Sequence, residues 1–191
     1  MMSHMGIKAF DRDDWRWLNE PRAWSDQDGL SITSDPDSDF WRTTHYGYVR
    51  DSGHVLGVPL TGDFTIVASF TADYAAQYDQ AGIALWVDGR NWIKAGVELV
   101  DDEFQVSTVV TRDVSDWSVV PGGPVQRATI SAVREGDAVT VRYGMGDAEP
   151  TTMLRLAYFP PEVEALVGVM AAAPTGPGFT TRFDRVQVTT A

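Results

Sequence analysis

The sequence contains no cysteine among its 191 residues, which excludes a disulfide framework and any chemistry that needs a thiolate. Basic residues are also few, because 15 Lys and Arg stand against 27 Asp and Glu, and the formal net charge is -12. A surface this acidic repels phosphate backbones and anionic lipid headgroups. We therefore expect neither a nucleic acid nor a membrane as a partner.

Long apolar runs are absent as well. No run approaches the roughly 18 residues of a membrane span, and the N-terminal MMSHMGIKAF lacks the apolar core of a signal peptide. Together with the missing cysteine, this predicts a cytoplasmic protein. Residues 1–5 contain Ser3-His4-Met5, which resembles a cloning remnant, so His4 is given no role. The length predicts a single domain over residues 1–191, since all-β sandwiches commonly reach about 200 residues undivided.

The dominant pattern in the chain is an alternation of apolar and polar residues with period two, which is typical of half-buried strands. Helical spacing of apolar residues is nearly absent. The alternating stretches are separated by turn signals such as Asp88-Gly89-Arg90-Asn91 and Pro121-Gly122-Gly123-Pro124. The predicted strands cover residues 64–71, 82–88, 92–99, 104–111, 127–133, 138–143, 152–157, 165–172 and 179–189. Short strands with tight connections predict an all-β, two-sheet antiparallel sandwich.

The most informative stretch is Gln80–Val100, QAGIALWVDGRNWIKAGVELV, which reads as two strands joined by a turn. In the second strand the odd residues are apolar and should face the core, so the even ones project to the other side. The first strand projects its even residues in the same way. The side chains expected on this face are Gln80, Gly82, Ala84, Trp86, Trp92, Lys94, Gly96 and Glu98.

A sheet face of this composition has large polar and aromatic side chains standing over a floor of Gly and Ala. That shape suits a groove for a flat, polar ligand such as a sugar, because rings stack on C–H faces while amides and charges bond the hydroxyls. The alternative is that Lys94 and Glu98 form a solvated charge pair worth about 0.2–1 kcal/mol, and that Trp86 or Trp92 covers an edge. Trp is seldom exposed on a sheet face without a binding or packing role, which favours the groove interpretation.

A second aromatic stretch, Asp39–Leu56, is expected to line one end of the groove with Phe40, Trp41, Tyr46 and Tyr48. His45 in the same stretch is a candidate ligand-binding residue that could act as an acid, a base or a metal ligand, although a hydrogen-bonding or structural role is the simpler interpretation. No HxH or HExxH spacing is present, so no metal site is predicted. Trp117 is expected in a loop that overhangs the groove. The early tryptophans, Trp15, Trp17 and Trp24, are expected to pack in the core.

These motifs resemble an uncharacterised concanavalin A-like family, some members of which are named regulation of enolase proteins. The resemblance rests on Trp24, on Asp39-Phe40-Trp41-Arg42, on QAGIALWVDGRNWIKAGVE and on Asp116-Trp117-Ser118, and it extends to the closing Phe183-Asp184-Arg185-Val186. It implies a concanavalin A-like jelly-roll sandwich related to lectins and glucanases. It also implies that Gln80, Trp92, Lys94 and Glu98 belong to the recurrent motif. It supplies no reaction.

Three functions follow as hypotheses. Non-catalytic binding of a carbohydrate or small polar ligand in a concave sheet groove is favoured, without a cofactor. A glycoside hydrolase-like enzyme using Glu98 is an alternative, but its second carboxylate is missing from the strand, and Lys94 nearby should favour the ionised form of Glu98. An intracellular regulatory domain that binds a protein partner is the other alternative. On the binding hypothesis, Glu98→Gln and Trp92→Ala should leave the fold intact and abolish ligand binding.

Overall fold

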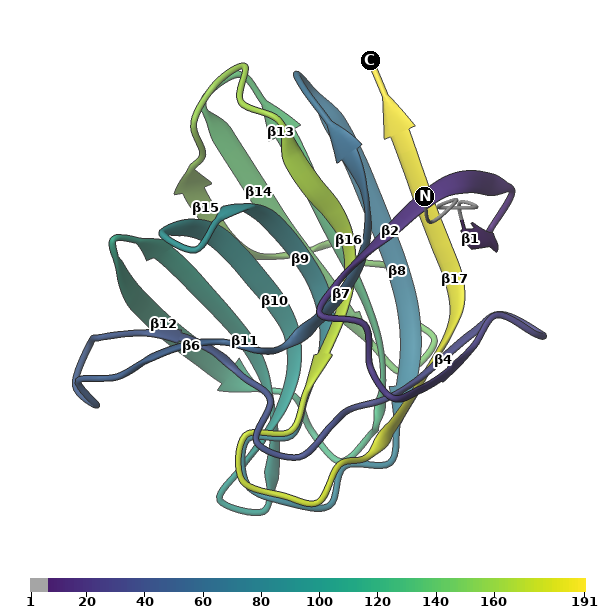
Figure 1. Cartoon of the computed structure of the whole chain (residues 1–191), viewed down its shortest axis with the longest axis vertical. Helices are drawn as coiled ribbons and strands as arrows, with labels where there is room; N and C mark the ends of the chain where they lie inside the picture. The colour runs from purple at the N-terminus through teal and green to yellow at the C-terminus, as the bar shows by residue number, and fades with distance from the viewer. Residues whose placement is uncertain (1–6) are drawn as a thin grey trace, which may run out of the picture.

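The computed structural model describes residues 7–191, so Ser3-His4-Met5 lies outside the described residues. Within this range the chain forms seventeen strands and no helix. It therefore contains, in the part described, no helix with the length and apolar character that a membrane crossing requires. Figure 1 shows two large sheets facing one another. A small hairpin forms a third, two-stranded sheet of its own.

The larger sheet has eight strands in the spatial order β1 (Ile7–Ala9), β2 (Arg12–Leu18), β7 (His54–Leu60), β16 (Ala165–Ala172), β9 (Gln80–Asp88), β10 (Asn91–Val100), β11 (Glu103–Arg112) and β12 (Val114–Pro121). The second sheet has seven strands in the order β15 (Thr152–Tyr158), β14 (Ala138–Met145), β13 (Arg127–Glu135), β8 (Phe64–Ala72), β17 (Thr180–Thr190), β4 (Leu30–Thr33) and β3 (Ala23–Ser25). The hairpin pairs β5 (Phe40–Arg42) with β6 (Val49–Asp51). The predicted two-sheet antiparallel jelly-roll sandwich is confirmed.

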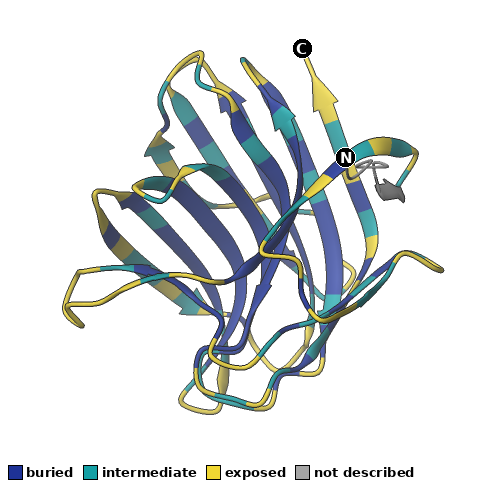
Figure 2. Ribbon diagram, in the orientation of Figure 1, coloured by how far each residue is buried: buried dark blue, intermediate teal, exposed yellow. Residues whose placement is uncertain are grey.

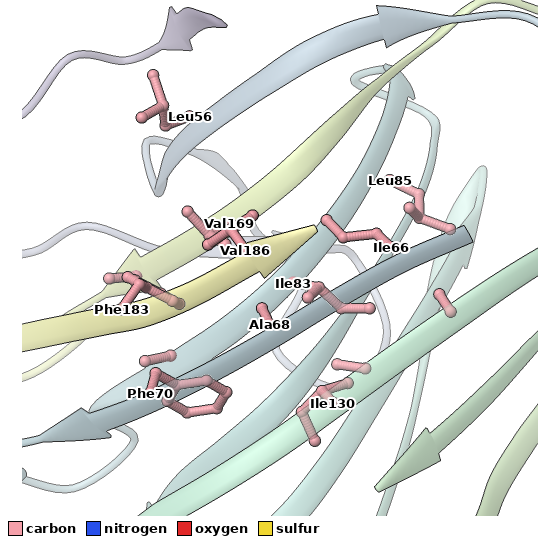
Figure 3. Packing of buried hydrophobic residues seen from close by; sticks show 14 of the residues in the cluster. Leu56, Ile66, Ala68, Phe70, Ile83, Leu85, Ile130, Val169, Phe183 and Val186 are labelled. Carbon is pink, nitrogen blue, oxygen red and sulfur yellow. The ribbon is translucent and has the colours of Figure 1, made fainter. Parts of the chain in front are cut away.

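The core lies between the two sheets, where alternate residues of each strand meet. Figure 2 shows the central strands mostly buried, and Figure 3 shows Ile66 and Phe70 of β8 packed among residues of the facing sheet such as Ile83 and Leu85 of β9. These side chains belong to one continuous cluster of buried apolar residues. Because period two assigns alternate residues to opposite faces, the same alternation fixes which residues of β9 and β10 are left for the outer face.

The early tryptophans pack as the sequence predicts. Trp15 is buried in the main core, and Trp17 and Trp24 are partly buried against it with their ring centroids 5.4 Å apart. His54, at the start of β7, is buried in a structural role. Its Nδ1 donates to the carbonyl of Asn19 at 2.6 Å, and its Nε2 accepts from the backbone amide of Asp35 at 3.0 Å.

One predicted loop is instead a strand. Residues 114–121 form β12, an edge strand that pairs along its length with β11. Its polar residues hid the alternation, because an edge strand with one solvated face needs few apolar side chains. Trp117 therefore sits at a fixed register position opposite Val109, and not on an overhanging loop.

Candidate functional site

The register of β9 and β10 sets the floor of the candidate site on the outer face of the larger sheet. Gln80 lies opposite Glu98, and Gly82 lies opposite Gly96. A Cβ atom at Gly96 would fall 1.9 Å from the carbonyl oxygen of Ala81, so no larger residue fits without moving the neighbouring strand. The two facing glycines keep the floor low between the taller side chains on either side.

A two-residue turn fixes the next strand against this floor. Asp101 and Asp102 both have positive φ, 52° and 62°, which is the conformation of a type I′ hairpin turn. The turn pairs Leu99 with Phe104 and places Gln105 opposite Glu98. The register of β11 under the site is therefore determined locally, by two adjacent aspartates that tolerate the left-handed conformation.

The β5–β6 hairpin lies across β10, β11 and β12 (Figure 1). Its residues Trp41, Tyr46 and Tyr48 line one side of the site. The hairpin is tied down by the backbone amide of Arg42, which donates to Ser115 Oγ at 2.9 Å. Trp41 Nε1 donates to the carbonyl of Thr44 at 2.9 Å, and the Trp41 ring meets Trp117 edge-on at 6.5 Å between centroids. The hairpin thus holds an aromatic wall against β12.

The wall and the floor enclose a pocket with a cavity volume of about 110 Å³, several times the 10–15 Å³ or so that one water requires. We call it the outer-face pocket. Five aromatic rings surround a floor of charged and amide groups, which are buried although they face the cavity. The lining residues are Asp39, Trp41, Tyr46, Tyr48, Arg50, Tyr78, Gln80, Lys94, Glu98, Val109, Trp117, Pro174 and Thr175.

Lys94 is the central charge of the floor. Its Nζ donates to the carbonyl of Phe40 at 2.7 Å and to Gln80 Oε1 at 2.5 Å, and it lies 3.5 Å from Asp39 Oδ1. The side chains of Lys94 and Asp39 are each 9% exposed. An ammonium group has three protons to donate, so these contacts occupy it fully. Lys94 therefore joins β9, β10 and the segment before β5.

Glu98 is buried at the bottom of the pocket and is held from one side. Its Oε2 accepts from Trp117 Nε1 at 3.1 Å, and the same N–H lies 3.0 Å from Ser107 Oγ. Burial raises the pKa of Glu98, and this effect outweighs the opposing attraction of Lys94 and the hydrogen bonds from Ser107 and Trp117. Lys94 does favour the ionised form of Glu98, as the sequence predicts, but desolvation is the larger influence and the pKa rises on balance.

The raised pKa of Glu98 predicts a pH-dependent stability. A carboxyl group whose folded pKa lies above its unfolded value stabilises the fold fully below the unfolded pKa, and that contribution is lost as pH rises through the folded pKa. Glu98→Gln cannot ionise, so the variant should gain stability relative to the wild type as pH rises from about 4 to about 8. Urea denaturation of both proteins across this range measures the difference. A difference that stays constant with pH would contradict the prediction.

Two tyrosines from different loops meet at the pocket. Burial raises the pKa of Tyr46, and a hydrogen bond with Tyr78 adds to the effect. Tyr78 has a φ of 69°, which is unusual for a bulky residue. Its backbone N–H donates a hydrogen bond to the carbonyl of Leu99 at 2.7 Å, which holds this conformation. Asp79 supports the same turn by accepting from the amides of Ala75 and Ala76. The strained backbone aims Tyr78 into the pocket.

The structure brings six of the nine sequence-predicted binding residues together at the pocket: Trp41, Tyr46, Gln80, Lys94, Glu98 and Trp117. Three are placed elsewhere. His45 is exposed on the hairpin beside Tyr46, with ring centroids 4.8 Å apart. Trp86 and Trp92 stack on each other at 5.9 Å and pack against Phe40 in a second apolar cluster.

The expectation that Trp92 stands exposed over the floor is therefore wrong. The side chain does project to the outer face, as its even position in β10 predicts, but Phe40 of β5 covers it and only 2% of the residue is exposed. The period of a strand tells which face a residue joins, and says nothing of what packs on that face.

Several pocket residues were not predicted as binding residues. Asp39 and Arg50 are two of them, and the density of aromatic and charged residues in their stretch was the signal available. Tyr48 lines the pocket as expected, whereas Phe40 packs against Trp86 and Trp92 instead. Tyr78, Pro174 and Thr175 come from loops and carried no signal. No group of three or more His, Asp or Glu side chains within residues 7–191 is arranged to hold a metal ion.

Comparison with known proteins gives a family and a fold. A family model described as "Protein of unknown function (DUF1349)" matches residues 17–191. "Regulation of enolase protein 1" from Saccharomyces cerevisiae is 36% identical over 175 residues, which are 91% of this chain and 88% of the relative. A crystal structure of a functionally unknown protein from Saccharomyces cerevisiae has a TM-score of 0.87 and 34% identity, and covers 93% of this chain and 97% of its own.

More distant structures share the fold alone. The carbohydrate-binding module CBM66 from Bacillus subtilis has a TM-score of 0.59 at 17% identity, covering 99% of both chains. The GH43 protein BlXynB from Bacillus licheniformis has a TM-score of 0.68 at 14% identity, and the match covers 92% of this chain but 36% of that protein. The sandwich is thus one that also occurs in carbohydrate-binding modules and glycoside hydrolases.

Proposed function

This chain belongs to the family of unknown function DUF1349, and we propose that it binds a carbohydrate or a small polar ligand in the outer-face pocket. The observation that carries the proposal is the pairing of five aromatic rings with a buried polar floor in one cavity. Rings of this kind stack on the C–H faces of a sugar, while fixed polar groups orient its hydroxyls.

The floor is organised before any ligand arrives. Lys94 is hydrogen-bonded to Gln80 and paired with Asp39, and Glu98 accepts a hydrogen bond from Trp117. Groups already held in place lose little conformational freedom on binding, which favours affinity. The likeness to the module CBM66 supports the proposal at the level of the fold only.

A thermal-shift screen against mono- and oligosaccharides and sugar acids tests the proposal. A ligand at 100 times its dissociation constant stabilises the fold by about 2.7 kcal/mol, which raises the melting temperature of a domain of this size by about 5 °C or more. A folded protein that responds to no sugar at millimolar concentration would contradict carbohydrate binding.

The screen gains a site-specific control from two tyrosines of similar exposure. Tyr46 lines the pocket and is 44% exposed, whereas Tyr158 on β15 lies outside it and is 49% exposed. Tyr46→Ala should weaken the binding of a sugar hit by about 2- to 10-fold, since one aromatic contact is worth about 0.5–1.5 kcal/mol. Tyr158→Ala should leave affinity unchanged. Titration calorimetry of both variants makes the comparison, and equal losses would place the ligand outside the pocket.

A further inference from the structure

Two carboxyl groups from distant parts of the sequence line the outer-face pocket. Glu98 comes from the middle of β10, and Asp39 comes from the segment that leads into β5. Both are buried, with 7% of each residue exposed, and their charges influence each other across the cavity. Two carboxyl groups facing one cavity are the groups that acid–base hydrolysis of a sugar requires.

Lys94 makes the surroundings of these two groups unequal. Its ammonium lies 3.5 Å from Asp39 Oδ1 and donates its remaining hydrogen bonds to Phe40 and Gln80. Among residues 7–191, no hydrogen bond joins Lys94 to Glu98. Asp39 therefore has a cation beside it and also accepts from the amide of Phe40 at 2.8 Å. These contacts fix the Asp39 carboxylate in place at the wall of the pocket.

Glu98 has the opposite environment. It is enclosed by Trp117 and the floor of the sheet, and burial raises its pKa. The contacts of the two groups differ, so Glu98, with no cation bonded to it, suits the role of proton donor, and Asp39, with a cation and an amide donor beside it, suits the role of proton acceptor. The sequence opposes catalysis because β10 carries one carboxylate and a nearby lysine. The fold answers the first objection, since Asp39 supplies the second carboxylate, and burial outweighs the second, because the pKa of Glu98 is raised although Lys94 lowers it.

We propose that the outer-face pocket hydrolyses a glycosidic bond, with Glu98 as the proton donor and Asp39 as the carboxylate that activates water. This inference rests on the proposed sugar binding. The proton of Glu98 passes to the glycosidic oxygen as the bond from that oxygen to the anomeric carbon breaks. A water oxygen forms the new bond to the anomeric carbon, and one proton of that water passes to Asp39. Exchange with solvent then returns a proton to Glu98 and removes the proton from Asp39, and no oxidation or reduction is involved.

The test uses the full chain and 4-nitrophenyl glycosides of hexoses and pentoses in both anomeric configurations. The wild type should release 4-nitrophenol from at least one of them. Glu98→Gln and Asp39→Asn should each lower kcat/KM by about 100- to 10,000-fold, the contribution expected of a positioned acid or base. Glu103→Gln is the matched control, because Glu103 is exposed at the start of β11, outside the pocket, and its replacement should change the rate less than about 2-fold.

A second set of substrates separates the two roles. A 2,4-dinitrophenyl group leaves without a proton, so Glu98→Gln should recover kcat close to the wild type on these glycosides, whereas Asp39→Asn should not. Recovery in neither variant, or equal release by Glu98→Gln and wild type on the 4-nitrophenyl substrates, would overturn the assignment.

Binding measured in parallel distinguishes the two proposals. A sugar that stabilises the protein in the thermal-shift screen, with no release of nitrophenol above the buffer rate across the panel, would overturn catalysis and leave the binding function standing. Absence of both binding and turnover in a folded protein would overturn the proposed function and this inference together.

Discussion

Replacement of Trp92 by alanine is expected to destabilise the fold by about 3–5 kcal/mol, the usual cost of removing a large buried aromatic side chain. Trp92 is 2% exposed, lies against Phe40 and stacks on Trp86 in the cluster that joins the β5–β6 hairpin to the larger sheet. The cavity left behind would weaken the attachment of the hairpin that forms one wall of the pocket. Urea denaturation followed by circular dichroism measures the loss in the free energy of unfolding.

Two further variants show whether Trp92 acts through packing. The Trp92 Nε1 is buried and has no hydrogen-bond partner within residues 7–191, so Trp92→Phe should cost much less than alanine and should retain ligand binding. Trp86→Ala should cost less as well, because Trp86 is only half-buried. Wild-type stability in Trp92→Ala, with ligand binding lost, would restore the direct binding role that the sequence suggested.

Replacement of Lys94 by alanine is expected to cost about 3–5 kcal/mol, because it leaves a buried negative charge without its partner. Asp39 would lose a cation 3.5 Å away, and the carbonyl of Phe40 and the amide oxygen of Gln80 would lose their shared donor. Glu98 would lose the attraction that lowers its pKa, so its pKa should rise further. Chemical denaturation near neutral pH measures the loss.

The double variant Lys94→Met, Asp39→Asn is the control for this explanation. Replacing both members of a buried ion pair by neutral groups of similar size is often close to neutral. The free energy of unfolding of the double variant should therefore exceed that of Lys94→Ala by about 2 kcal/mol, which is several times the measurement error. Equal stability of the two variants would mean that the loss comes from packing of the lysine stem, and not from an unpaired Asp39.

The strands of the sandwich were largely predictable. All nine stretches predicted from alternation are strands in the structure, with ends that shift by a few residues. The signal was lost where a strand lies at an edge, as in β12, and where strands are only three or four residues long, as in β3 to β6. It was also lost in β2 and β7, which have seven residues each and lie inside the larger sheet. Short elements span too few residues to show a period, and edge strands have too few buried positions.

The candidate site was predictable in part. Gln80, Lys94 and Glu98 line the pocket because their even positions place them on the outer face of adjacent strands in register. Trp92 shares that face and still lies outside the pocket, since β5 covers it. Asp39 was in a stretch marked as aromatic and polar, but nothing in the sequence shows that it reaches Lys94.

The sequence by itself determined the two sheets and the face that each side chain of β9 and β10 occupies. Both follow from the local geometry of an extended chain, in which successive side chains point to opposite sides. Only the tertiary structure decided that residues 39–51 fold back over that face, hide Trp92 and set Asp39 beside Lys94. That placement depends on contacts between distant residues, such as the bond from the Arg42 amide to Ser115 and the bridge between Pro36 and Ala173. Contacts between residues far apart in the sequence produce no repeating pattern of apolar and polar residues, because each contact joins a single pair of positions.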